Sequence, residues 1–308
     1  MNFSFKTCVL LLALAAVQCS CGGGSTSTAS SNSSPAPRMS RVFVVLEENH
    51  SFRSVIGSPD MPFLNGLVPQ GALAMQYFAN AHPSLPNYLM LTAGQAIASD
   101  DSFSGVVTQD NVVRELTAAG KSWKSYAENL PSVGYLGPNA GGYAREHNPF
   151  AFLTDVLNDA SQSANLVPFS QFFADLASDR VPDYAFIVPD LQNDAHDCPG
   201  GVASCPDSQR LAAADKWLKT NIGPVLTSSA FTQDGLLIIL FDESSGGDMA
   251  HGGGHVPMLI LSPKAKAGFQ SSTFYQHQST LRLTLEALGI QNWPGMAANA
   301  PGMGEFFK

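Results

Sequence analysis

Acidic side chains follow three short apolar runs of the sequence. The groups are Glu47, Glu48 and Asn49 after VFVVL (42–46), Asp190 and Asp194 after YAFIV (184–188), and Asp242 and Glu243 after LLIILF (236–241). Carboxylates that converge on one poorly solvated edge repel one another and raise each other's pKa, and a divalent cation between them relieves this repulsion. For any single group, the alternative is that acids and Asn begin turns after strands. Three such groups together favour a binding site.

Two histidines accompany these acids. His196 follows Asp194 in DAHD, and His255 follows the stretch HGGG and precedes the apolar run 256–261. Carboxylates combined with imidazoles are typical of a hydrolytic site for divalent metal ions. We therefore predict a site for one or two divalent ions, whose ligands are Glu48, Asn49, Asp194, His196, Asp242, Glu243 and His255.

Four further residues of these loops have less specific roles. His251 is as consistent with an ordinary loop residue as with a metal ligand or a phosphate donor. Asp190, Asp197 and Asp248 are expected to hold ligands in place or to form turns. Oxygen ligands suit Mg²⁺, Mn²⁺ or Ca²⁺ and imidazoles suit Zn²⁺, so the sequence leaves the identity of the metal open.

A candidate nucleophile lies in the segment HPSLPNY, residues 82–88. Ser84 stands between two prolines, which restrict the turn, and before a predicted helix. The first turn of that helix would present free N–H groups to an oxyanion, and a nearby cation would help to deprotonate the hydroxyl group of Ser84, which could then attack phosphorus. Without such a site, Ser84 would be an ordinary residue at the start of a helix.

A sheet must bring these loops to one edge. The runs 42–46, 184–188, 236–241 and 256–261 are continuously apolar, as in strands buried on both faces. Helical patterns lie between them at 111–119, 209–220 and 280–288, with Asp110 and Ser279 as predicted N-caps of the first and the last. This alternation predicts a single α/β domain with a doubly wound, largely parallel sheet and helices on both faces, whose ligand crevice lies at the carboxyl ends of the strands.

The beginning of the chain has the pattern of an export signal. Lys6 and the apolar run 9–17 precede Ser20-Cys21-Gly22, so we predict a leader over residues 1–21, a flexible Gly/Ser linker over 22–38 and one folded domain over 39–308. Cys21 resembles the lipid-accepting cysteine of bacterial lipoproteins. The expected location is the cell envelope if Cys21 is lipidated, and the periplasm or the medium if the leader is cleaved and the protein released.

Only two cysteines, Cys198 and Cys205, lie in the predicted domain. In an oxidising compartment we predict a disulfide between them, and the alternative is half of a metal site, for which no completing pair of ligands lies nearby.

The charge of the chain excludes one class of partner. Its 308 residues include 16 basic and 25 acidic side chains, for a net charge of −9. Such a balance disfavours nucleic-acid binding through a basic face. No run outside the leader is long enough to span a bilayer, so a membrane contact is expected only through the possible lipid anchor.

Five motifs occur here in the order of a known family. EENHSF, HPSLPNYL, PDLQNDAHD, FDE and GHVP resemble those of the phosphoesterase family that contains bacterial and fungal acid phosphatases and phospholipases C, over about residues 40–263. The resemblance implies the alkaline phosphatase-like fold, Ser84 as the nucleophile and a metal contact, and His196 and His255 at the site. It also implies metal binding by Glu48, Asn49, Asp242 and Glu243. The implied ligand of the protein is a small phosphate ester or a phospholipid headgroup.

Two departures from the family favour its phosphatase branch. Arg53 stands where phospholipase C members carry Asp, and the chain ends at Lys308 without their C-terminal β domains. We therefore predict a phosphomonoester hydrolase that forms a phosphoserine on Ser84, which water activated by a second metal position, His196 or His255 then hydrolyses. The alternatives are a phospholipase C-type phosphodiesterase and, more distantly, a metal-stabilised binding protein without turnover. A sulfatase is disfavoured because Tyr88 replaces the Arg of its signal, and a serine hydrolase because no G-x-S-x-G motif is present.

Overall fold

The computed structural model describes residues 1–2 and 34–308. Residues 34–308 all belong to one compact unit. Most of the predicted leader, the predicted lipidation site Cys21 and most of the predicted linker lie outside the described residues. The end of that linker packs against the domain, because Ala36 is buried and its N–H donates to Glu286 at 3.3 Å.

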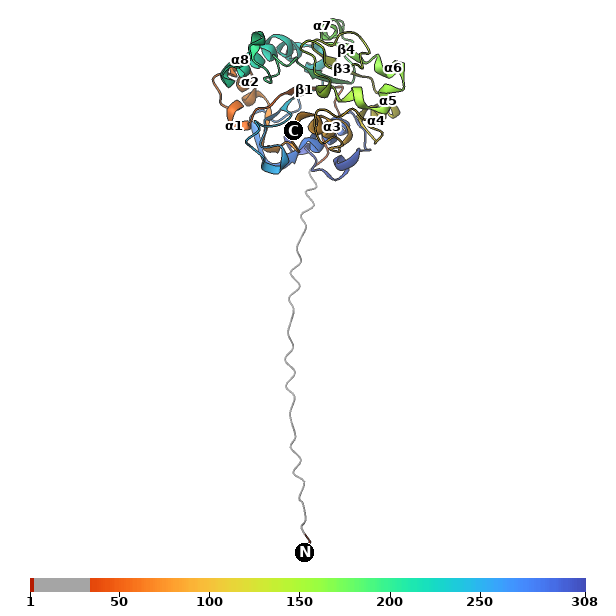
Figure 1. The fold of residues 1–308 in the computed structure, drawn as a ribbon, viewed down its shortest axis with the longest axis vertical. Coiled ribbons are helices and arrows are strands. Elements are labelled where there is room, and N and C mark those ends of the chain that lie inside the picture. The colour runs from red at the N-terminus through yellow and green to blue at the C-terminus, as the bar shows by residue number, and fades with distance from the viewer. Residues whose placement is uncertain (3–33) are drawn as a thin grey trace. The chain divides into compact units, whose positions relative to one another are not determined.

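A mixed sheet lies at the centre of the unit (Figure 1). Its eight strands are ordered β4-β3-β5-β1-β6-β7-β2-β8, and all run in one direction except β7. The strands are β1 (Arg41–Glu47), β2 (Ala72–Phe78), β3 (Trp123–Ala127), β4 (Leu166–Pro168), β5 (Tyr184–Val188), β6 (Gly235–Phe241), β7 (Met258–Leu261) and β8 (Phe269–Gln276). The predicted α/β fold with a largely parallel sheet is confirmed.

The central strands are covered on both faces. Every residue of β5 and β6 is buried, and so are all residues of β1 except Arg41. Because successive side chains of a strand point to opposite faces, this burial requires packing on each side of the sheet. The strand β8 lies at the edge and mixes buried with exposed residues, so it lacks the continuous apolar pattern that identified the central strands.

Ten α-helices connect the strands of the described part of the chain. They are α1 (Phe52–Val55), α2 (Pro62–Leu67), α3 (Ser84–Ala93), α4 (Val112–Ala118), α5 (Thr154–Leu157), α6 (Ala160–Ser163), α7 (Ser170–Ala177), α8 (Asp207–Trp217), α9 (Ser229–Thr232) and α10 (His277–Ala287). The three predicted helices correspond to α4, α8 and α10. None of the described helices is long and apolar enough to cross a bilayer.

Two of the predicted helix starts were wrong. Asn111, not Asp110, is the N-cap of α4, because its side chain accepts hydrogen bonds from the N–H groups of Val113 and Arg114. The helix α10 begins at His277, with Gln276 before it, and Ser279 lies buried inside its first turn.

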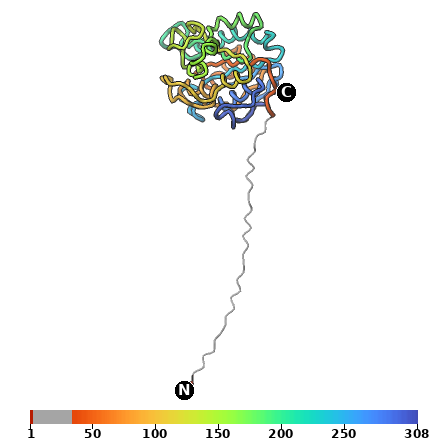
Figure 2. Tube along the Cα trace, turned by 90° about the vertical axis from the view of Figure 1, so that its right-hand side faces the viewer, coloured from red at the N-terminus to blue at the C-terminus, as the bar shows by residue number. Residues whose placement is uncertain are grey.

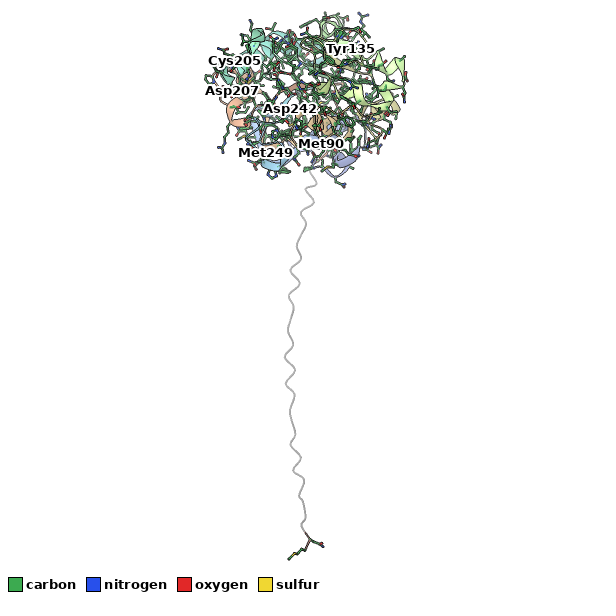
Figure 3. The ribbon with its side chains drawn as sticks, in the orientation of Figure 1. Met90, Tyr135, Cys205, Asp207, Asp242 and Met249 are labelled. Carbon is green, nitrogen blue, oxygen red and sulfur yellow. A yellow bond between two sulfur atoms is a disulfide. The ribbon has the colours of Figure 1, made fainter. Side chains whose placement is uncertain are left out.

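The described unit contains the predicted disulfide, and its two ends lie close together. Cys198 and Cys205 form the predicted disulfide, with their Cα atoms 5.7 Å apart. The bridge lies directly before α8, where Figure 3 labels Cys205 and Asp207. The C-terminus lies beside the first described residues of the unit, as Figure 2 shows, and Ser34 and Phe307 line the same cavity.

Candidate active site

The acids that follow β1 and β6 meet at the carboxyl edge of the sheet. These strands are parallel neighbours in a register that pairs Glu47 with Phe241. The next residues, Glu48 and Asp242, are therefore adjacent, and both are fully buried. The backbone N–H of Asn49 donates to Oδ1 of Asp242 at 3.1 Å, and its side-chain amide lies 3.5 Å from Oε2 of Glu48.

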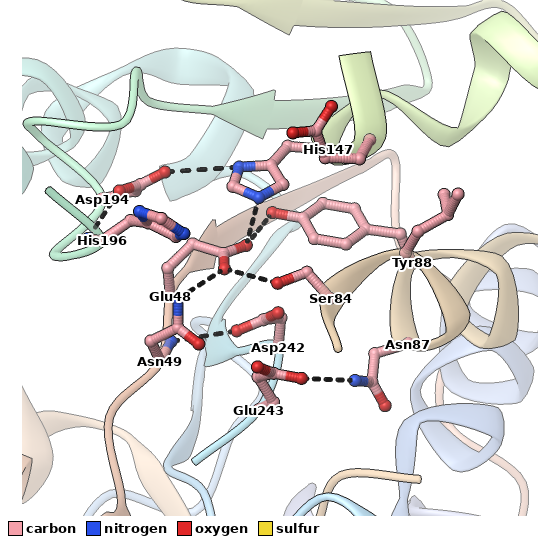
Figure 4. Close-up of polar contacts among 12 residues, drawn as sticks. Glu48, Asn49, Ser84, Asn87, Tyr88, His147, Asp194, His196, Asp242 and Glu243 are labelled. Atoms are coloured by element: carbon pink, nitrogen blue, oxygen red, sulfur yellow. Dashed lines mark hydrogen bonds and ion pairs between the residues drawn. The ribbon is translucent and has the colours of Figure 1, made fainter. Parts of the chain in front are cut away.

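Helix α3 directs two hydroxyl groups at Glu48 (Figure 4). Ser84, the first residue of α3, donates from Oγ to Oε2 of Glu48 at 3.0 Å. Tyr88 donates from its hydroxyl group to Oε1 of the same carboxylate. Residues four apart in a helix share one face, so both oxygens of Glu48 are held by the same helix. Ser84 is 4% exposed.

His147 connects Glu48 with the acid that follows β5. Its Nε2 lies 3.5 Å from Oε1 of Glu48, and its Nδ1 lies 3.5 Å from Oδ2 of Asp194. Burial opposes a charge on this ring, but Asp194 and then Asp242 outweigh burial, so the pKa of His147 is raised. The ring of Tyr88 stacks on that of His147 at a centroid distance of 5.2 Å. An imidazole that favours its charged form thus lies between two buried carboxylates.

Glu243 has a separate set of partners. Its Oε2 lies 3.1 Å from Nδ1 of His82 and 3.5 Å from the side-chain nitrogen of Asn87. Burial, followed by the charges of Asp242 and Asp101, raises the pKa of Glu243 to about 9. Because Nε2 of His82 donates to the carbonyl of Asp248, its Nδ1 can accept a hydrogen bond from the protonated carboxyl group of Glu243.

The two predicted catalytic histidines lie in different places. His196 is 38% exposed, contacts Asp197 through Nδ1 at 2.8 Å, and its ring centroid is 5.9 Å from that of His147. His255 is stacked between Phe52 and Phe78, at 4.5 and 4.8 Å, and its Nε2 donates to the carbonyl of Met75. Among the described residues, no hydrogen bond or ion pair connects His255 with Ser84, Glu48 or Asp242. The structure therefore brings His196 to the cluster and leaves His255 beside it.

The remaining loop residues form turns or packing contacts. His251 adopts a positive φ of 56° and packs against Phe78 and Phe274. Asp190 and Asp248 accept backbone hydrogen bonds within their own loops, as expected of turn residues. The N–H of Leu85 donates to Asp101 at 2.8 Å, and Pro86 has none, so the first turn of α3 offers fewer free donors than the sequence predicted.

The electrostatics of the cluster fit a cation. Burial, followed by Asp242 and Asp194, raises the pKa of Glu48 well above its usual range, against the hydrogen bond from Tyr88. The Oδ2 atoms of Asp194 and Asp242 are buried and have no hydrogen-bond partner. Within residues 34–308, no three Asp, Glu, His or Cys side chains are arranged to hold a metal ion. A cation here would therefore combine Glu48 and Asp242 with amide and hydroxyl oxygens, which Asn49 and Ser84 supply.

A buried histidine fixes the backbone at Asp242. His277 donates from Nε2 to the carbonyl of Asp242 and accepts from the hydroxyl group of Tyr77 through Nδ1 at 2.9 Å. Both contacts require a neutral ring, and burial lowers the pKa of His277 to about 4.

Sequence reasoning assigned no role to His82, Asn87, His147 or His277. His82 and Asn87 lie in the motif that identified Ser84, so this motif could have pointed to both residues. The side chain of Asn87 accepts from the N–H groups of Asn80 and Ala81 and thereby shapes the turn before Ser84. His147 lies in a 3₁₀ turn of a long connection, where no periodic pattern or repeated motif could identify it.

Comparison with solved structures identifies the fold of this chain. The fold is similar to that of a protein in the alkaline phosphatase superfamily from Vibrio parahaemolyticus, with a TM-score of 0.62, 15% identity and coverage of 88% of this chain and 71% of that one. It is also similar to the lipoteichoic acid synthase LtaP from Listeria monocytogenes, with a TM-score of 0.59, 12% identity and coverage of 88% and 76%. The alkaline phosphatase-like fold is confirmed.

Sequence comparison gives the family. The model of the Phosphoesterase family matches residues 58–291, and the chain belongs to this family of phosphate-ester hydrolases, as the motifs predicted. A probable acid phosphatase of Kluyveromyces lactis is 31% identical over 250 residues, which are 78% of this chain and 56% of that protein. A phosphatidylinositol-3-phosphatase of Mycobacterium tuberculosis is 31% identical over 267 residues, which are 86% of this chain and 82% of that protein. The chain thus spans about half the length of the first relative and most of the second.

Proposed function

We propose that the protein hydrolyses phosphate monoesters through a phosphoserine on Ser84. The observation that carries this proposal is the hydrogen bond from Ser84 Oγ to the buried carboxylate of Glu48, at 3.0 Å. The names of the two relatives support the monoester preference, because an acid phosphatase and a phosphatidylinositol-3-phosphatase both remove a terminal phosphoryl group. They favour this reaction over the phospholipase C alternative.

In the first step, Oγ of Ser84 forms a bond to phosphorus as the bond to the leaving oxygen breaks. Glu48 orients the hydroxyl group through the hydrogen bond that it accepts, and the proton of that group passes to water. The alkoxide that leaves takes a proton from water. His147, held between Glu48 and Asp194, offsets negative charge in the buried site.

In the second step, water attacks the phosphorus of the phosphoserine as the bond from phosphorus to Oγ breaks, and Oγ of Ser84 takes a proton from water. His196 is partly exposed beside His147, so we assign to it the removal of a proton from that water. His255 is proposed to line the neighbouring groove, because its ring is stacked between two phenylalanines.

We further propose that one or two divalent ions bind at this cluster. Glu48 and Asp242 would be the acidic ligands, with Ser84 and Asn49, and Asn49 could instead contact a phosphate oxygen. Asp194, His196 and Glu243 do not surround one point in residues 34–308, so a second ion would take at most two of them and complete its coordination with water. When bound, a divalent ion neutralises phosphate charge and lowers the pKa of the serine hydroxyl group.

Replacement of Ser84 tests the nucleophile. In Ser84→Ala, turnover of p-nitrophenyl phosphate should fall at least about a thousandfold, because the attacking oxygen is removed. Ser163→Ala is the matched control, since that hydroxyl group only donates to the carbonyl of Ala160. Acid quench followed by mass spectrometry should detect a phosphoryl group on Ser84 of the unmodified enzyme. A fully active Ser84→Ala enzyme would rule out the covalent mechanism, and faster turnover of p-nitrophenyl phosphorylcholine would favour the phospholipase C alternative.

A further inference from the structure

A polar groove extends from the site along the loops that follow β1 and β6. One part has a volume of about 540 Å³ and is lined by Arg53 and His255, among others. A second part, of about 250 Å³, includes Asn49 and Arg210. The two parts share His50, Asp207 and Ser245, so they form one continuous surface.

The groove begins at the catalytic cluster. Asn49 belongs to its wall, and the N–H of Asn49 donates to Asp242. His50, which lines both parts, donates from Nδ1 to the carbonyl of Glu48 at 3.0 Å. A phosphate ester with its phosphorus at Ser84 can therefore extend its alcohol portion into this groove.

Arg53 contributes an uncompensated positive charge to the groove. It is exposed, and within residues 34–308 its guanidinium group has no hydrogen bond or ion pair. It lines the same part of the groove as His255. Burial, more than the charge of Arg53, lowers the pKa of that ring, against the carbonyl of Met75 and the charge of Asp248.

The other charged residues of the groove have partners. Asp207 pairs with Arg210 through Nη1 at 2.8 Å, whereas Nε of Arg210 is buried and has no hydrogen-bond partner. The carboxylate oxygens of Asp248 accept from the N–H groups of Ala250 and His255. The acids are thus satisfied within the protein, and the donors left over belong to the two guanidinium groups.

We propose that Arg53 binds a second anionic group of the substrate, so that the preferred substrates are phosphate monoesters whose alcohol carries another phosphate or a phosphodiester. Guanidinium groups bind phosphate oxygens through paired, charge-assisted hydrogen bonds. This proposal rests on the proposed function, because it takes the reacting phosphate to lie at Ser84.

Kinetics with two related sugars test the proposal. We expect kcat/KM for fructose 1,6-bisphosphate to exceed that for fructose 6-phosphate, and Arg53→Gln to lower this ratio by about tenfold, through KM. Such a change corresponds to about 1.4 kcal/mol. Arg180→Gln is the control, since the Nε of Arg180 donates only to the nearby Ser178, and it should leave the ratio unchanged. A ratio that Arg53→Gln does not alter rules out a soluble bisphosphate as the preferred substrate, and the same result with the anionic vesicles described below overturns the proposal.

Binding separates this proposal from the proposed function. In the Ser84→Ala background, titration calorimetry should show about tenfold weaker binding of fructose 1,6-bisphosphate when Arg53→Gln is added, and a smaller change for fructose 6-phosphate. If the unmodified enzyme turns over no phosphate ester, the proposed function fails while this binding difference still supports the groove. Equal binding of fructose 1,6-bisphosphate with and without Arg53→Gln rules out the groove as a site for soluble bisphosphates, even if the enzyme is a phosphatase.

The second anionic group can belong to a soluble ester or to a lipid headgroup. Vesicles of phosphatidylcholine that contain phosphatidylglycerol phosphate present a monoester next to a phosphodiester. A loss of turnover in Arg53→Gln with the vesicles but not with the sugar assigns the groove to a lipid headgroup. The reverse result assigns it to a soluble bisphosphate, and no loss with either rejects the role of Arg53.

Discussion

The hydroxyl group of Tyr88 donates a hydrogen bond to Oε1 of Glu48, one helical turn after the Ser84 hydroxyl group that contacts Oε2. Tyr88 therefore helps to fix the carboxylate that holds the hydroxyl group of Ser84. In Tyr88→Phe, kcat for p-nitrophenyl phosphate should fall about tenfold, because a hydrogen bond to a charged group contributes about 1.5–3 kcal/mol.

The control for this change is Tyr135→Phe, whose hydroxyl group contacts only the carbonyl of Pro138. Thermal unfolding of both variants shows whether the loss is one of stability or of catalysis. Normal kcat in Tyr88→Phe would mean that Glu48 is held adequately by Ser84 and His147 alone.

Removal of Asp242 should cost the protein both bound metal and activity. Its buried Oδ2 atom has no partner within the protein, and Glu48 lies beside it. In Asp242→Ala, metal content measured by plasma mass spectrometry should fall to near zero, and turnover should fall at least about a hundredfold.

Asp110→Ala serves as the control, because Asp110 pairs with Arg114 at 3.7 Å, at the start of α4. If Asp242→Ala keeps its full metal content and a near-normal rate, the proposed ligand set is incorrect.

Without divalent ions, the stability of the fold should fall as the pH rises from about 6.5 to about 9. Burial, Asp242 and Asp101 raise the pKa of Glu243 from 4.5 to about 9, so the folded state retains a proton that the unfolded chain has lost. The folded state then binds more protons, and the free energy of unfolding decreases with rising pH. Between about pH 4 and pH 6.5 the lowered pKa of His277 makes the free energy of unfolding rise with pH, because there the unfolded chain binds the extra proton. The fall in stability is therefore expected only above pH 6.5.

Thermal unfolding at pH 6.5 and pH 9, with a chelator and with added divalent ions, measures this dependence. The melting temperature should fall by several degrees with the chelator and by less with the ions. Glu243→Gln should reduce the fall with the chelator, since the amide does not titrate. A melting temperature that rises over this range in the chelator would contradict the assignment of a proton to Glu243.

Membrane attachment through Cys21 remains a prediction, because that residue lies outside the described part of the chain. Expression in a bacterial host with a labelled fatty acid should place label on the protein and bring it to the membrane fraction. Cys21→Ala should remove the label and release the protein, whereas Cys19→Ala is the matched control in the same segment. If Cys21→Ala fractionates with membranes as the unmodified protein does, attachment through Cys21 is wrong. An unmodified protein that carries no label and appears in the periplasm or the medium would instead indicate simple export and release.

The sequence predicted the architecture and most of the acidic cluster for one physical reason. A strand buried on both faces must be continuously apolar, so β1, β5 and β6 could be recognised, and their parallel direction places the residues that follow them at one edge. The link between Cys198 and Cys205 was equally accessible, because no other cysteine lies in the domain.

Only the tertiary structure decided which side chains meet. Glu47 and Glu48 are consecutive, yet only Glu48 contacts Ser84, while both carboxylate oxygens of Glu47 are buried without a hydrogen-bond partner. Neighbouring residues of an extended chain point in opposite directions, and the pattern of the strand does not say which direction faces Ser84. The motif EENHSF, not the strand pattern, had singled out Glu48. His147, and not His255, belongs to the cluster, because the 3₁₀ turn that carries it packs its ring on Tyr88. This turn is far from Tyr88 in the sequence, and such long-range packing leaves no local pattern.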